Sequence, residues 1–154
     1  MSKNSQETCF VCRKQRGELE MPGGVVFQDD LVYVSHGTMK RDELTYPGIF
    51  FVEPKRHLPT MAELTRPESE RVGWLASVVA RALVAEGAER TYLAVLGHHV
   101  PHLHVWIVPR YPNTPDKYVG VRVMEWESGP RKSWEQIGEL CARVSSYVRC
   151  EVVA

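Results

Sequence analysis

The sequence has no excess of charge of either sign and no apolar stretch long enough to cross a membrane. Lysine plus arginine and aspartate plus glutamate each number 19, so the formal net charge is zero. This balance argues against a histone-like or polyanion-coating protein, and nothing indicates a nucleic-acid partner. The longest apolar runs, such as Tyr92–Leu96 and Val78–Ala80, fall far short of the roughly 20 residues that a transmembrane helix needs, so no membrane partner is expected.

The beginning of the sequence lacks the basic segment and following apolar segment that mark a secretory signal. We therefore expect a cytoplasmic protein whose four cysteines are reduced rather than paired in disulfides. Of the 154 residues, 44% are hydrophobic and 25% are charged, which is typical of one domain with one sizeable core. We predict a single domain over residues 1–154.

Hydrophobic periodicity predicts several short strands and two helices. Strands are expected on both sides of a turn at 28–30, and then at 48–53, 92–96 and 102–108. A long helix is predicted from near Pro67 to Gly87, because four apolar residues recur at helical spacing: Val72, Leu75, Val79 and Leu83. A second helix is predicted from about 133 to 148. The expected fold class is α+β, a β-meander with one long helix inserted and another at the end.

Histidine is concentrated in one short segment. Four of the six histidines fall within seven residues: His98, His99, His102 and His104. Residues two apart in a strand share a face, so His102, His104, Trp106 and Val108 are expected to point away from the core. Neutral imidazole can ligate a metal, transfer a proton or attack phosphorus to form a covalent intermediate. His104 is the candidate nucleophile, and a surface strand that merely carries histidines is the alternative.

Cys9 and Cys12 form a C-x-x-C pair close to the N-terminus. The spacing is that of a zinc knuckle, although a pair supplies only two ligands. A thioredoxin-like redox role is disfavoured, because that motif follows a strand in a βαβ unit and no strand is predicted before Cys9. Two thiols without a metal are the remaining alternative.

The segment Gly97–Arg110, G-H-H-V-P-H-L-H-V-W-I-V-P-R, resembles the signature of the histidine triad (HIT) family of nucleotide hydrolases and transferases. Upstream, F-Q-D-D-L-V-Y-V is similar to the family's first hairpin, and Phe50–His57, F-F-V-E-P-K-R-H, to its P-K-x-H strand end. The resemblance covers roughly residues 9–112 and leaves 113–154 as a C-terminal extension. It implies an antiparallel sheet of about five strands with one long inserted helix and a C-terminal helix, usually in a homodimer.

The resemblance also implies an activity. It predicts a hydrolase or nucleotidyltransferase that acts on the α-phosphate of dinucleoside polyphosphates or nucleoside phosphoramidates through a nucleotidyl-histidine on His104. Trp106 stands where the third triad histidine would be, and indole donates a hydrogen bond but cannot shuttle a proton. We hypothesise that His98 or His99, at positions that face the phosphate in the family, supplies that proton. The alternative is a nucleotide-binding module with little turnover, closed by Trp106.

Two further expectations follow from the resemblance. Some members of the family bind zinc through a cysteine pair, the histidine after P-K-x and the first histidine of the motif. The matching residues are Cys9, Cys12, His57 and His102, which would form a closed structural zinc site rather than a catalytic one. The family's ribose-binding acid should follow the first hairpin, and Asp42 in the loop there is the candidate for substrate binding.

Overall fold

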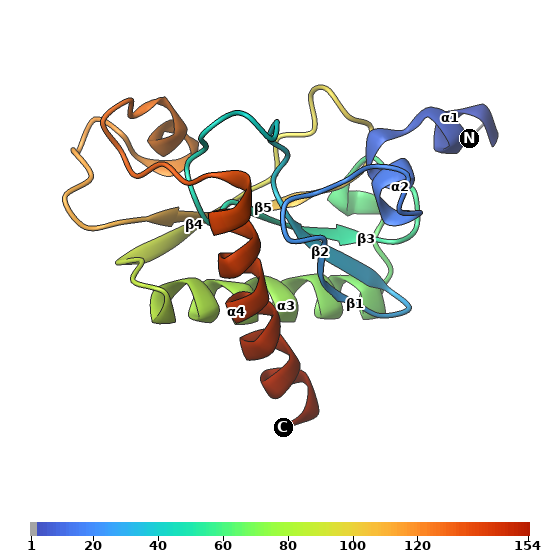
Figure 1. Cartoon of the computed structure of the whole chain (residues 1–154). Coiled ribbons are helices and arrows are strands. Elements are labelled where there is room, and N and C mark those ends of the chain that lie inside the picture. The colour runs from blue at the N-terminus through green and yellow to red at the C-terminus, as the bar shows by residue number, and fades with distance from the viewer. Residues whose placement is uncertain (1–2) are drawn as a thin grey trace.

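The computed structural model describes residues 3–154, with side chains from Gln6 onward, and has an α+β fold. Its strands are β1 (Val25–Gln28), β2 (Val32–His36), β3 (Phe50–Pro54), β4 (Arg90–Ala94) and β5 (Val105–Arg110). Its helices are α1 (Lys3–Thr8), α2 (Phe10–Gln15), α3 (Arg66–Ala85) and α4 (Trp134–Val153), with short 3-10 helices η1 (Met61–Glu63) and η2 (Gly120–Glu125). The predicted class, with one long inserted helix and one C-terminal helix, is confirmed (Figure 1).

The five strands form one antiparallel sheet in the order β1-β2-β3-β5-β4. The expected meander is therefore wrong at one point, because β5 lies between β3 and β4. The chain leaves the sheet after β3, runs through α3 and returns at the edge as β4, and β5 then fills the space between them. This arrangement pairs Phe51 with Trp106 and Val52 with Val105.

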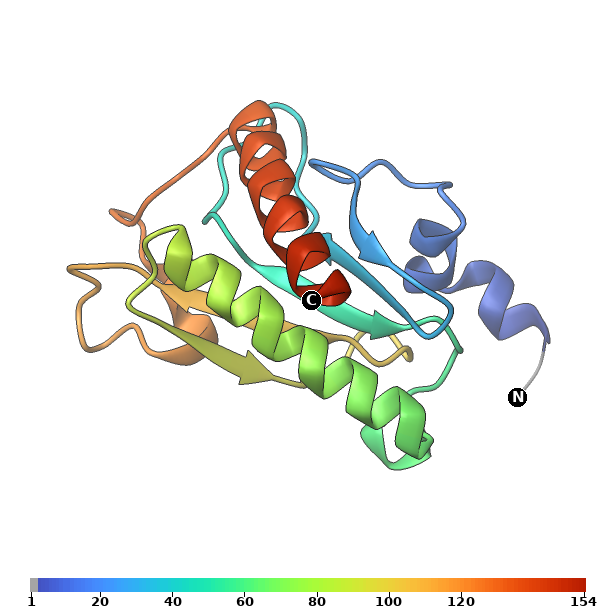
Figure 2. The same cartoon turned by 90° about the horizontal axis from the view of Figure 1, so that it is seen from below.

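Helices α3 and α4 both cover one face of the sheet, as the view from below shows (Figure 2). Thr65 caps α3, and the carboxylate of Glu68 accepts a hydrogen bond from the backbone N–H of Thr65 in a capping box. The apolar stripe that predicted α3 is buried against the sheet. Helix α4 continues to Val153, beyond the predicted end near 148, because no glycine or proline interrupts it there.

The opposite face of the sheet is covered at its two ends. Helix α2 lies over one end, and the chain around η2 lies over the other (Figure 1). The η2 segment packs an apolar cluster onto β5, and four members of this cluster are fully buried: Tyr46, Ile49, Val108 and Val123. The histidine segment runs along this face between the two covers.

Strand β5 begins three residues later than predicted. The backbone N–H of His102 donates to the carbonyl of Val100, and the N–H of Leu103 donates to the carbonyl of Leu58, so this stretch bonds outside the sheet ladder. The predicted alternation holds from there on, since Val105 and Ile107 belong to the core beneath α3 while Trp106 packs on the other face. His102 and His104 thus approach the sheet from a loop.

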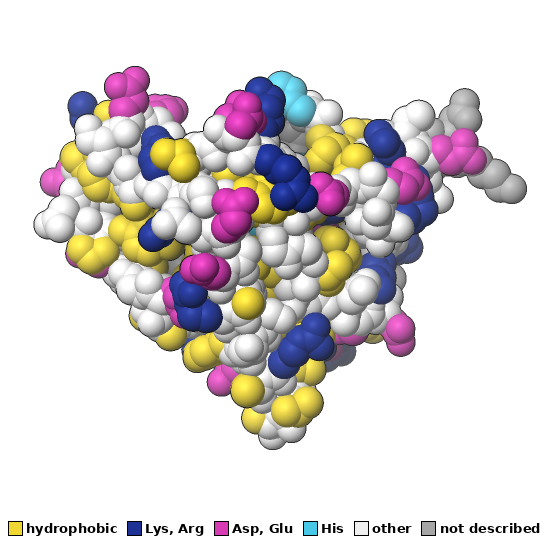
Figure 3. All heavy atoms as spheres, viewed as in Figure 1, with side chains coloured by type: hydrophobic (Ala, Val, Ile, Leu, Met, Phe, Trp, Pro, Cys, Tyr) yellow, Lys and Arg dark blue, Asp and Glu magenta, His cyan; other side chains and the backbone are white. Residues whose placement is uncertain are grey.

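The surface carries charge of both signs. On the face drawn in Figure 3, lysine and arginine side chains are interspersed with aspartate and glutamate. Among residues 3–154, no helix combines the length and the apolar character of a membrane span.

Candidate metal centre and histidine site

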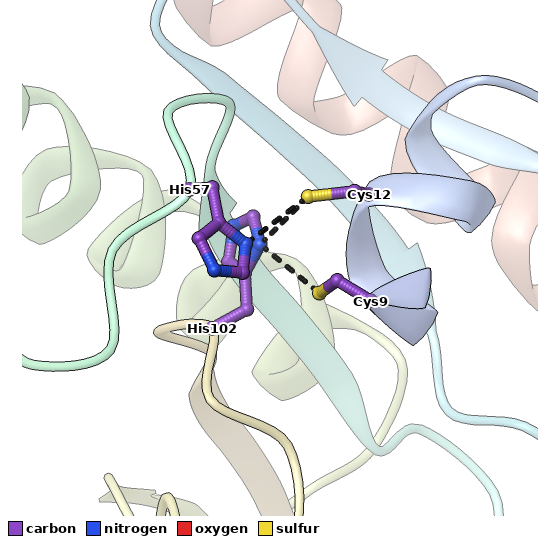
Figure 4. A group of neighbouring side chains, drawn as sticks. All are labelled: Cys9, Cys12, His57 and His102. Carbon is purple, nitrogen blue, oxygen red and sulfur yellow. Dashed lines mark hydrogen bonds between the residues drawn. The ribbon is translucent and has the colours of Figure 1, made fainter. Parts of the chain in front are cut away.

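Four buried side chains from three separate segments meet beside the N-terminal arm (Figure 4). Cys9 is the N-cap residue of α2 and Cys12 lies one turn later, so both thiols leave the same side of the helix. His57 follows β3, and His102 precedes β5. The ligand atoms of the four residues all lie within 4.8 Å of one another, which makes the set a possible metal site.

The separations within this set suit a tetrahedral ion. Nδ1 of His102 lies 3.6 Å from Sγ of Cys9 and 3.4 Å from Sγ of Cys12, and Nδ1 of His57 lies 3.3 Å from Sγ of Cys12. Zinc–sulfur and zinc–nitrogen bonds of about 2.3 and 2.0–2.1 Å at tetrahedral angles separate the two ligand atoms by about 3.6 Å. The residues present therefore fit zinc in both ligand type and spacing.

A backbone hydrogen bond orients the ring of His102. Its Nε2 lies 2.8 Å from the carbonyl oxygen of Pro54, and a carbonyl can only accept, so Nε2 carries the proton. The lone pair of a neutral ring is then on Nδ1, the atom that faces the two thiols. A histidine that ligates a metal through one ring nitrogen usually donates a hydrogen bond from the other nitrogen in this way.

Burial also sets the charge state of the ligands. It lowers the pKa of His102 to about 4, so the ring is neutral at pH 7, as ligation requires. Burial and the neighbouring Cys9 raise the pKa of Cys12 to about 11, which keeps this thiol protonated until a cation replaces the proton.

His104 is the next histidine along and has a different environment. Its Nδ1 lies 2.7 Å from the carbonyl oxygen of His102, so Nδ1 is the donor and the lone pair of the neutral ring is on Nε2. The ring is half-buried and meets the edge of Phe51 at a centroid distance of 5.6 Å. An oriented imidazole with one free lone pair on a partly open face can act as a nucleophile or a base.

Trp106 lies beside His104, with ring centroids 6.0 Å apart. It also packs at right angles to Phe51 at 4.7 Å, within the apolar cluster that η2 covers. Within the described residues its indole Nε1 is buried and has no hydrogen-bond partner. The indole therefore fills space next to His104 without joining a hydrogen-bond network.

The other predicted site residues lie on the surface. His98 and His99 are exposed in the loop between β4 and β5, and Asp42 is exposed in a turn between β2 and β3. The neighbouring His36 is buried, donating from Nδ1 to the carbonyl of Gly37 and accepting the N–H of Gly48 at Nε2. Both of its ring nitrogens are thus engaged in holding the ends of this loop.

Sequence reasoning missed one charged pair on the site face. Lys14 and Glu53 are both buried, and Nζ of Lys14 lies 2.7 Å from Oε1 of Glu53. The available signal was a single glutamate in the otherwise apolar strand F-F-V-E-P, since an acid in such a strand requires a buried partner. Nothing in the sequence identified Lys14 among the 19 lysines and arginines as that partner.

Comparison with known structures finds proteins that share this fold. A zinc-bound histidine triad family protein from Mycobacterium smegmatis superposes with a TM-score of 0.71 at 16% identity, over 97% of this chain and 99% of that one. A Hit-like protein involved in cell-cycle regulation from Bartonella henselae gives 0.64 at 19% identity, over 92% and 96%. A hypothetical histidine triad nucleotide-binding protein from Sulfolobus tokodaii gives 0.63 at 21%, over 92% and 93%.

At these identities the likeness to the solved structures establishes the fold. A search of curated proteins finds no match to the sequence. The comparison with protein families is more specific, because the HIT domain matches residues 18–113. This range includes all five strands, His57 and the histidine segment, and it begins after the cysteine pair. The match spans more than half of the sequence, and the chain accordingly belongs to the HIT-domain family.

Proposed function

We propose that the protein is a nucleotide hydrolase or nucleotidyltransferase in which His104 attacks the α-phosphate of a dinucleoside polyphosphate or a nucleoside phosphoramidate. The observation that carries the proposal is the hydrogen bond from Nδ1 of His104 to the carbonyl of His102, which leaves Nε2 with a free lone pair at a half-buried position. Membership of the HIT-domain family supports it, as does the nucleotide-binding name of the Sulfolobus tokodaii protein.

The reaction divides into two displacements at phosphorus. The Nε2 lone pair forms an N–P bond, and the bond from phosphorus to the leaving oxygen or nitrogen breaks, with its electron pair departing on the leaving group. The leaving group then takes up a proton, and we propose that His98 or His99 donates it. Water, or another acceptor in a transferase, then attacks phosphorus and gives its proton to the histidine, His98 or His99, that lost one in the first step. The N–P bond breaks and its electron pair returns to Nε2.

The zinc ion belongs to the proposal as a structural component. Zinc bound by Cys9, Cys12, His57 and His102 would have four protein ligands and no position for a water molecule, so it would crosslink three segments without activating a nucleophile. The zinc-bound state of the Mycobacterium smegmatis protein supports the binding of zinc. The ion would hold the carbonyl of His102 in the position that orients His104.

Trp106 favours a second candidate function. Its indole packs in an apolar cluster beside His104 and offers no group that can carry a proton to a leaving group. A protein that binds nucleotides with little or no turnover is the outcome expected if His98 and His99 do not replace the missing histidine. In either case Asp42 is the proposed contact to the sugar.

The proposal includes a homodimer formed through the edge of the sheet. Strand β4 ends the sheet, and exposed apolar side chains at and after it include Leu93, Val95 and Leu96. Beside them, a largely apolar hollow of about 270 Å³ is lined by residues of β4 and α3. An unpaired edge with apolar neighbours suits a second copy related by a two-fold axis. Light scattering of the wild type and of Leu93→Lys tests this, since the variant should be monomeric.

Intact-protein mass spectrometry tests the chemistry. The protein would be incubated briefly with diadenosine polyphosphates or with adenosine phosphoramidate and quenched, beside His104→Ala as the matched variant. An adenylyl adduct in the wild type only, together with released AMP, is the expected result. Bound nucleotide with neither adduct nor AMP over long incubation would contradict the enzyme and support the binding protein.

A further inference from the structure

A buried ion pair links the metal-binding arm to the strand next to His104. Lys14 on α2 and Glu53 on β3 are 2% and 1% exposed, and Nζ of Lys14 lies 2.7 Å from Oε1 of Glu53. The same ammonium group donates to Oγ of Ser35 at 3.1 Å and lies over the rings of Tyr33 and Phe51. Such a pair is costly to desolvate, so replacing it by apolar residues is often neutral for stability.

Glu53 lies on β3, one residue beyond the last residue of that strand that pairs with β5. Strands β3 and β5 pair Phe51 with Trp106 and Val52 with Val105, and one further step in this antiparallel direction leads to Glu53 and to His104, which lies just before β5 and outside the ladder. Residues two apart share a face, so Glu53 and Phe51 lie on the same side of the sheet as His104 and Trp106. The ring of Phe51 lies 5.6 Å from that of His104, so the carboxyl group of Glu53, two residues further along β3, is on the side of the sheet that His104 occupies.

One oxygen of this carboxyl group is left over. Oε1 is bound by Lys14, whereas Oε2 is buried and has no hydrogen-bond partner within the described residues. A buried carboxylate oxygen without a hydrogen-bond partner lowers the stability of the fold, so a functional role would explain why it is there. Burial raises the pKa of Glu53 above its ordinary value, and the ammonium group of Lys14 opposes this shift.

We infer that Glu53 is a positioning residue of the histidine site, whose carboxylate, held by Lys14, stabilises the positive charge that His104 acquires when a nucleotidyl group is attached to it. This inference rests on the proposed function. The donor Nδ1–H of His104 keeps its proton when Nε2 bonds to phosphorus, so the ring becomes a cation in the intermediate. An anion already fixed beside it needs no reorganisation during the reaction.

Lys14 connects the ion pair to the candidate metal centre. It follows Cys12 by two residues on α2, so the helix that carries two metal ligands also delivers the cation that holds Glu53. Helix α2 is thereby connected to His104 in two ways. One connection is through His102, which contacts the cysteines and precedes His104 in the chain, and the other is through Glu53 on β3.

Three variants separate this role from simple support of the fold. Glu53→Gln keeps the shape of the side chain but removes its charge and leaves Lys14 unpaired. Lys14→Met with Glu53→Gln removes both charges, which avoids an unpaired buried cation. Lys14→Arg keeps the pair and serves as the conservative control. For each we would measure the single-turnover rate of adenylyl-adduct formation, nucleotide affinity in the His104→Ala background, zinc content and thermal unfolding.

The expected result is a chemical step slowed about tenfold or more in Glu53→Gln, as for the loss of one close charge, with nucleotide affinity within about twofold. The double variant should unfold at a higher temperature than Glu53→Gln yet remain equally slow, and Lys14→Arg should react at a rate near that of the wild type. A double variant that recovers the wild-type rate would show that the pair only supports the fold. A wild type that forms no adduct would overturn the proposed function itself, whereas an adduct that forms equally fast in Glu53→Gln would overturn this inference alone.

Discussion

The carbonyl oxygen of His102 accepts a hydrogen bond of 2.7 Å from Nδ1 of His104, while the ring of the same His102 faces the thiols of Cys9 and Cys12. One residue thus belongs to the candidate metal centre by its side chain and to the candidate nucleophile by its backbone. The orientation of His104 is therefore tied to the position of His102.

Removal of one ligand should abolish zinc binding. We expect His57→Ala to purify with less than one zinc ion per chain and to lose at least about 3 kcal/mol of unfolding free energy, because structural zinc contributes directly to folding. Elemental analysis and chemical denaturation measure the two effects. Cys150→Ser alters an exposed cysteine outside the cluster and should leave both unchanged. A zinc content of one in His57→Ala would contradict the assignment.

Zinc binding should release protons. The pKa of Cys12 is raised to about 11, so its thiol is protonated at pH 7 in the metal-free protein. Because zinc binds thiolates, we expect at least one proton, that of Cys12, to leave per zinc ion. Calorimetric titration in two buffers of different ionisation enthalpy counts the protons released. Release of no protons would mean that the cysteines are not ligands.

His36 should make the fold sensitive to acid. Burial lowers its pKa to about 4, whereas an unfolded histidine titrates near 6.5. Between these values only the unfolded chain takes up the proton, so stability falls as the pH decreases from 6.5 to 4, by about 3 kcal/mol in total. Denaturation at pH 7.5, 6 and 5 should give a shallower decline for His36→Gln than for wild type. The exposed His99→Gln should behave as wild type, and equal slopes in all three proteins would refute the effect.

Trp106→Phe should keep the protein folded and able to form the adduct. The indole N–H is buried without a partner, so its removal leaves no other group unsatisfied, and we expect unfolding free energy within about 1 kcal/mol of wild type. If His98 or His99 protonates the leaving group, the double variant with alanine at both positions should be slowed far more than Trp106→Phe. The opposite order of rates, measured in the same mass-spectrometric assay, would show that Trp106, and not His98 or His99, assists the leaving group.

Gly23 and Gly24 offer a matched pair of substitutions next to each other. Both have positive φ, 71° and 64°, so alanine is strained at either site. A Cβ on Gly23 would also overlap the side chain of Cys141, whereas a Cβ on Gly24 would meet open space. We expect a loss of about 1 kcal/mol for Gly24→Ala and more than about 3 kcal/mol for Gly23→Ala. Equal losses in urea denaturation would show that α4 can move away.

Much of the fold could be predicted because its signals are local. The spacing of Val72, Leu75, Val79 and Leu83 predicted α3, and the alternation of Val105 and Ile107 predicted the inward face of β5. The place of β5 between β3 and β4 could not be derived in this way. It depends on which strands pair after a long helical connection, and that is decided by packing across the whole sheet.

The candidate site likewise contains residues that the sequence identified and residues that only the folded structure revealed. The resemblance to a family brought Cys9, Cys12, His57 and His102 together, and the structure places their ligand atoms within one small cluster. The roles of His98, His99 and Asp42 stay predictions, since all three lie on the surface. Lys14 and Glu53 escaped notice because 39 residues separate them in the chain and only the folded sheet makes them neighbours.

The spacing of the four candidate ligands has a consequence for the order in which the chain gains its structure. Cys12 lies 45 residues before His57 and 90 residues before His102. A bound ion would therefore close a ring that contains β1, β2, β3, α3 and β4 and leaves α4 outside it. During synthesis the cysteines are made first but must wait for both histidines, so the ring closes only when most of the sheet exists. Once closed, it would restrict the unfolded chain over these segments and not over α4, which lies outside the ring.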